Sequence, residues 1–82
     1  MGTKTEEMAL LSQGKGCLAK AADDEMIFIL RSQDKLYIPA VMVWADELAS
    51  IHGKDHPKVV EAYQNIERAR LWQGLHPTKY PD

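Results

Sequence analysis

The sequence predicts a small, mostly helical α+β fold, and three observations lead to that prediction. A chain of 82 residues has room for one core, so residues 1–82 are expected to form a single small domain. The segment at about 26–31 is short, apolar, β-branched and aromatic, which favours a strand. Apolar residues at 3.6-residue spacing predict two helices, at about 38–52 and 56–73, packed as an antiparallel pair.

A short helix is expected ahead of the strand, over residues 4–12. Thr5 is a candidate N-cap, and Glu6 and Glu7 favour the first turn because they complement the helix dipole. The few residues before this helix are expected to be flexible. Two alternatives remain for residues 16–20: a further helical turn, or a weak strand that pairs within the chain.

A lone strand needs hydrogen-bond partners for its backbone, and an unpaired apolar edge invites association. The same strand from a second copy, paired antiparallel across a two-fold axis, would supply those partners. The sequence therefore favours a homo-oligomer with the strand at its interface.

The two longer helices have recognisable ends. Pro39 suits the first turn of the first helix, where a missing N–H costs little, and Gly53 is placed to end it. Asp55 is a candidate N-cap for the second helix, which Gly74 is expected to close. The prolines that follow predict a loose tail over residues 75–82.

Charge and composition exclude several classes of protein. Ten Lys and Arg against 12 Asp and Glu give a net charge of −2, which argues against general binding to nucleic acid. No apolar run is long enough to span a membrane, and no secretory h-region is visible at the start. A single cysteine suits a reducing compartment.

No residue pattern indicates catalysis, a cofactor or a metal. Cys17 is interpreted as a small buried apolar residue, because no histidine lies near it in sequence. His52 and His56 have the spacing of helical metal ligands, but a hydrated turn that includes Asp55 explains them better. The acidic residues 23–25 are expected to form a solvated face. The protein is therefore predicted not to be an enzyme.

Convergent polar residues follow the predicted strand, and they form the candidate ligand site. Arg31 offers a planar guanidinium for phosphate or carboxylate, and Gln33 can bond to the edge of a base or sugar. Asp34 and Lys35 complete the group, although Asp34 is also a candidate turn or capping residue. The alternative interpretation of the group is surface ion pairing and turn bonding.

The helix at 38–52 has a second apolar face beside its inner one, and Trp44 lies on it. This face has three alternative interpretations: part of the core, a subunit interface or a stacking platform. A subunit interface is favoured. The residues assigned to the interface are Tyr37, Val41, Trp44 and Leu48.

One stretch resembles a known family. Residues 28–34 (FILRSQD), followed by Trp44 and Ala45, are similar to a signature of small bacteriophage and prophage proteins, an apolar strand running into Leu-Arg-x-Gln-Asp and then a helix with Trp-Ala. The resemblance covers about residues 14–72 and departs at Pro39, which is expected one position earlier. The resemblance implies a viral origin and a location in the host cytoplasm. Small phage proteins of this kind include counter-defence factors that sequester nucleotide signals of bacterial immunity.

Two functional hypotheses follow. In the first, the protein is an oligomeric sponge that binds a cyclic nucleotide without turnover, through Arg31, Gln33, Asp34, Lys35 and Trp44. In the second, it inhibits a host protein by direct contact through the face that carries Trp44. An enzyme that uses the acidic residues 23–25 ranks last.

Overall fold

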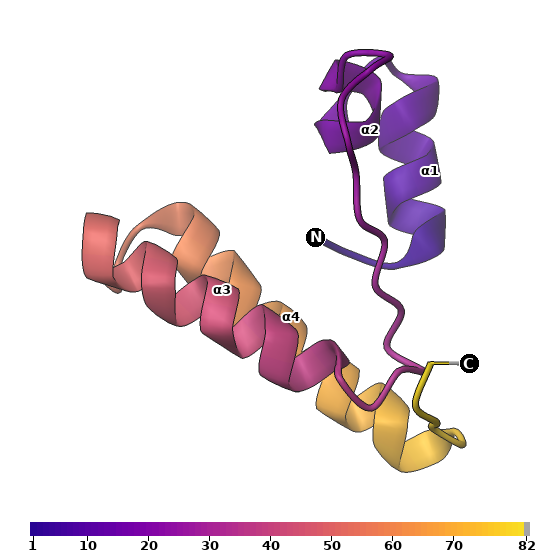
Figure 1. Ribbon diagram of the computed structural model, residues 1–82, viewed down its shortest axis with the longest axis vertical. Helices are drawn as coiled ribbons and strands as arrows, with labels where there is room; N and C mark the ends of the chain where they lie inside the picture. Colours follow the sequence, from indigo (N-terminus) through magenta and orange to yellow (C-terminus); the bar gives the residue numbers. More distant parts are fainter. Residues whose placement is uncertain (82) are drawn as a thin grey trace.

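The computed structural model describes residues 1–81, which form four helices connected by turns and extended segments. Figure 1 shows two parts: a short helical pair and a longer helical hairpin, with an extended segment between them. The short pair and the hairpin are made, in chain order, of α1 (Lys4–Ser12), α2 (Gly16–Lys20), α3 (Tyr37–His52) and α4 (Pro57–Leu75).

The predicted α+β fold is wrong, because the regular secondary structure within residues 1–81 consists of helices and includes no strand. Residues 26–31 are extended, but within the described chain the backbone of residues 26–30 forms no hydrogen bond with other backbone groups. A strand needs a neighbour that supplies a ladder, and the described residues supply only one isolated bridge, between Asp34 and Lys79. The pairing of this strand across an oligomer interface is therefore dropped as well.

The α3–α4 hairpin agrees well with the two longer helices predicted from the sequence, as the ends of its helices show. Gly53 ends α3 at φ 88°, and its N–H donates to the Ala49 oxygen at 2.8 Å. The predicted N-cap of α4, Asp55, is wrong: His56 caps it, and its ring nitrogen accepts from the Lys58 N–H at 3.1 Å. The reason is that Pro57 already has helical backbone, so the residue before it takes the capping position.

The core lies between α3 and α4 and is small. Its buried side chains are Ala45, Val59, Ala62, Asn65, Ile66 and Ala69, only one of which comes from α3. Since three of the six are alanines, little apolar area leaves water. No helix within residues 1–81 is both long and apolar enough to cross a lipid bilayer.

The α1–α2 pair attaches to α4 through polar contacts. The Arg68 guanidinium lies 2.9 Å from the Glu6 carboxylate, and the Met1 amino group lies 2.7 Å from the Glu61 carboxylate. No residue of α1 or α2 is buried. The structure also resolves the open alternatives at residues 16–20, which are helical.

Thr3, and not the predicted Thr5, caps α1. Its hydroxyl accepts from the Glu6 N–H at 3.1 Å, and the Glu6 carboxylate accepts from the Thr3 N–H at 2.8 Å. The Thr3 N–H, the Arg68 guanidinium and the Thr3 hydroxyl together lower the pKa of Glu6 from 4.5 to about 2. The ionised carboxylate of Glu6 thus joins the cap of α1 to the surface of α4.

Candidate functional site

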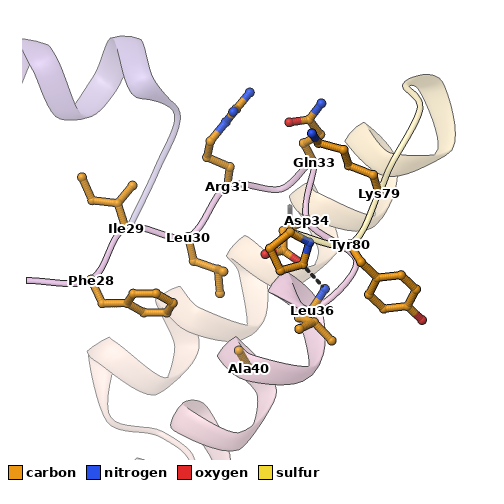
Figure 2. A pocket seen from close by; sticks show the side chains of 11 residues that line it. Phe28, Ile29, Leu30, Arg31, Gln33, Asp34, Leu36, Ala40, Lys79 and Tyr80 are labelled. Atoms are coloured by element: carbon orange, nitrogen blue, oxygen red, sulfur yellow. Dashed lines mark hydrogen bonds between the residues drawn. The ribbon is translucent and has the colours of Figure 1, made fainter.

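A cleft of about 500 Å³ lies where the extended segment meets the start of α3 and the C-terminal segment (Figure 2). It is open to solvent on one side, and apolar and aromatic side chains line most of it. The lining residues are Phe28, Ile29, Leu30, Arg31, Gln33, Asp34, Leu36, Ala40, Lys79, Tyr80 and Pro81.

A tight turn between the extended segment and α3 contributes Arg31, Gln33 and Asp34 to the lining of this cleft. The Asp34 N–H donates to the Arg31 oxygen at 2.9 Å, and the Asp34 oxygen accepts from the Tyr37 N–H at 3.0 Å. The Asp34 carboxylate accepts from the Leu36 N–H at 2.7 Å. Asp34 is therefore a turn residue at the entrance to α3, and part of the hydrogen-bonding capacity of its carboxylate is used there.

Two distant segments hold the turn in place. The Lys35 N–H donates to the Lys79 oxygen at 2.9 Å, and the Lys79 N–H donates to the Gln33 oxygen at 3.0 Å. From α4, the side-chain amide of Gln73 donates to the Ser32 oxygen at 3.0 Å. Because these bonds engage main-chain groups of the turn, they leave the side chains of Arg31 and Gln33 available.

The side chains of the cleft divide into an apolar and a polar set. Figure 2 shows Leu30 directed toward Leu36 and Ala40, whereas Arg31 points to the opposite side of the extended segment. Within residues 1–81, the Arg31 guanidinium forms no ion pair. The apolar side chains and the available guanidinium thus lie on opposite sides of the extended segment (Figure 2), and a ligand that contacted both would present a planar ring to one side and an anion to the other.

Two aromatic rings of the cleft are strongly exposed. Phe28 is 84% exposed and Tyr80 is 63% exposed, and the Lys35 ammonium lies 5.1 Å from the centre of the Tyr80 ring. Exposed rings beside cations can stack against a base whose phosphate the cations bind. Such a ligand would also cover apolar surface that is now in water.

The structure brings together most of the predicted ligand residues. Arg31, Gln33 and Asp34 line the cleft, and Lys35 lies beside it over Tyr80, but Trp44 is not part of the lining. Two lining residues were not among the predicted ligand residues: Phe28, which was assigned to the predicted strand, and Tyr80, which was assigned to the predicted loose tail. Residue 82, at the end of that predicted tail, lies outside the described residues. The aromatic character of both residues was the available signal, but nothing in the sequence brings them together.

The predicted interface residues take two different positions on α3. Tyr37, Val41 and Leu48 are half-buried, and the Tyr37 hydroxyl accepts from the Asn65 side-chain amide at 2.5 Å. Trp44 is 46% exposed. Tyr37 is thus bonded within the hairpin, and Trp44 is the residue of this set that is free to meet a partner.

The other residues considered for chemistry do not form a site. Cys17 is exposed, so its interpretation as a buried apolar residue is wrong. The His52 and His56 rings stack with centroids 4.9 Å apart. The acidic residues 23–25 are exposed. In the part of the chain that the structure describes, no three His, Cys, Asp or Glu side chains are grouped to hold a metal ion.

Comparison with known proteins adds no family assignment. No protein-family model, no curated protein and no solved structure matches the chain. The candidate site therefore has to be judged from its own residues.

Proposed function

We propose that the protein is a binding protein that sequesters a small nucleotide, such as a cyclic dinucleotide or a cyclic ADP-ribose species, without turning it over. The ligand would occupy the cleft between the extended segment, the start of α3 and the C-terminal segment. The observation that carries this proposal is that Arg31, Gln33, Phe28 and Tyr80 line one cleft.

Each part of a nucleotide has a matching group in this cleft. The Arg31 guanidinium suits a phosphate, and a second cation, the Lys35 ammonium, lies 5.1 Å from the centre of the Tyr80 ring. The Phe28 and Tyr80 rings suit the face of a base, and the Gln33 amide suits its edge or a ribose hydroxyl. None of these groups is arranged as a nucleophile with a base, which supports binding over catalysis.

The likeness of residues 28–34, Trp44 and Ala45 to small phage proteins supports a role in counter-defence inside an infected host. A phage protein that removes an immune signal needs only to be abundant and to bind tightly. The proposal therefore includes a viral origin, action in the host cytoplasm and a homo-oligomeric state.

Thermal unfolding with a panel of cyclic and linear nucleotides tests the proposal. A ligand at a thousand times its dissociation constant adds about 4 kcal/mol of stability, and each kcal/mol moves the midpoint by about 4–8 °C in a domain of this size. One nucleotide should raise the midpoint of the wild type by many degrees.

A charge-matched pair of variants locates the binding. Arg31→Gln should abolish the shift, whereas Arg70→Gln, which removes an exposed cation from α4, should retain it. A panel with no shift for any nucleotide would overturn the proposal. An equal loss in both variants would mean that general charge, and not the cleft, holds the ligand.

A second candidate function is inhibition of a host protein by contact through α3. It is favoured by exposed apolar residues on the outer side of this helix, among them Val43 at 64%, Trp44 at 46% and Ile51 at 70%. A saturable partner captured from bacterial lysate, and lost on Trp44→Ala but retained on Arg31→Gln, would support this candidate over the first.

A further inference from the structure

The single chain exposes more surface than a compact protein of its size. A folded monomer of 9.3 kDa is expected to expose about 5,000 Å², whereas this chain exposes 6486 Å², an excess of about 1,500 Å². Its radius of gyration is 13.7 Å, against about 11.7 Å for a compact domain of 82 residues. This excess belongs to the whole chain, including the extended segment, and it is larger than the roughly 800 Å² that a standard protein interface takes from each partner.

The outer side of α3 has a pattern that suits a second copy of itself. An exposed row runs along this helix, with spacings of four and three residues on each side of the adjacent pair Val43 and Trp44, and it keeps to one face. Its members are Leu36, just before the helix, and then Ala40, Val43, Trp44, Glu47 and Ile51. Only Glu47 among them is charged.

The spacing of this row, but not its residue types, is the same in both directions. Reversing it about the midpoint between Val43 and Trp44 exchanges Leu36 with Ile51 and Ala40 with Glu47. A two-fold axis requires such self-complementarity, because each surface patch must meet its own copy. The large residues then lie at matching levels, and the small Ala40 leaves room for Glu47 of the second copy.

We infer that the protein forms a two-fold dimer in which the outer faces of α3 pack antiparallel, with the axis between Val43 and Trp44. This interface is made of helices and does not involve strand pairing. In this dimer a second copy of the chain covers the exposed row. The excess surface, the small core of the single chain and the symmetric spacing of the row all support it.

The dimer also changes the candidate site. Leu36 and Ala40 belong both to the row and to the lining of the cleft. Antiparallel packing brings Ile51 and Glu47 of the second copy to the level of these two residues. Each cleft would then be bordered by the partner, and the dimer would carry two clefts related by the axis. The interface itself does not depend on the identity of the ligand.

Light scattering during gel filtration tests the inference. The wild type is expected to have the mass of two chains, and Val43→Glu that of one, because the substitution places like charges beside the axis. Arg70→Glu on α4 is the control and should remain a dimer. Circular dichroism checks that Val43→Glu keeps its helices.

A cross-link gives an independent readout that does not require a disruptive variant. With Cys17→Ser removing the natural thiol, Val43→Cys should form a disulfide-linked dimer on mild oxidation, and Arg70→Cys should not. A wild type with the mass of one chain would overturn the inference and leave α3 open to a host partner. A dimer that survives Val43→Glu and gives no cross-link would place the interface elsewhere.

The two proposals fail separately. If the protein is a dimer in both tests but binds no nucleotide, the α3 interface is supported and the nucleotide-binding function is ruled out. A monomer that binds a nucleotide at Arg31 supports the nucleotide-binding function and rules out this interface.

Discussion

The side-chain amide of Gln73, near the end of α4, donates to the main-chain oxygen of Ser32, 41 residues earlier in the chain, at 3.0 Å. The same amide nitrogen lies 3.5 Å from the Asp34 oxygen. These contacts join the turn that positions Arg31 and Gln33 to the helical hairpin. The geometry of the cleft therefore depends on a residue that does not line it.

Gln73→Glu should loosen this turn. A carboxylate has nearly the same shape as the amide but cannot donate, so the Ser32 oxygen loses its partner. We expect a loss of about 1 kcal/mol in the free energy of unfolding and weaker nucleotide binding. Urea denaturation and ligand titration measure both. Gln64→Glu, which makes the same change at an exposed position of α4, should alter neither.

Tyr37→Phe should destabilise the hairpin. It removes the acceptor of the Asn65 amide, which is 6% exposed, and a buried donor without a partner costs about 1–3 kcal/mol. Tyr63→Phe is the matched control, because the Tyr63 hydroxyl donates to Asp46 on the surface at 2.5 Å. Equal denaturation midpoints for the two variants would contradict the prediction.

Two glycines should respond to alanine in opposite ways. Gly53→Ala places a side chain at φ 88°, which costs about 1–3 kcal/mol at the end of α3. Gly74→Ala lies within α4, where the added Cβ meets no side chain or distant backbone within 4 Å, so it should stabilise the helix by about 0.5–1 kcal/mol. Thermal unfolding of both variants gives the signs directly, and two shifts of the same sign would refute the prediction.

The contact between α1 and α4 should weaken in acid. The lowered pKa of Glu6 means that its contribution to stability is present above 4.5, the ordinary pKa, and is lost as the pH falls toward about 2. An NMR titration of the Glu6 carboxyl carbon measures this pKa. Arg68→Gln should raise it but leave it below 4.5, since the Thr3 N–H and hydroxyl remain. A wild-type value of 4.5 would show that these contacts do not form.

The helices could be predicted because local patterns determine them. Residues 4–12 have the bounds of α1, and the expected bounds of the two longer helices differ from those of α3 and α4 by one or two residues. The strand at 26–31 could not be judged in this way. Its β-branched composition favours extended backbone, which the structure has, but a strand also needs a partner elsewhere in the chain.

Only part of the candidate site could be predicted from the sequence, for the same reason. Arg31, Gln33 and Asp34 follow each other closely, so a sequence pattern can find them. Tyr80 joins them through the pairing of Lys79 with Gln33 and Lys35, a contact between distant segments that no local pattern indicates. Trp44 was grouped with these residues by its chemistry, although α3 places it outside the cleft.

The central claim is that the cleft binds a nucleotide without turning it over. The most direct measurement is to mix the protein with the nucleotide that raises its unfolding midpoint, isolate the complex by ultrafiltration, denature it and identify the released nucleotide by mass spectrometry. We predict that the intact nucleotide is recovered in a fixed ratio to the protein, and that Arg31→Gln retains none. Recovery of a cleaved product, or equal retention by Arg31→Gln, would contradict the claim.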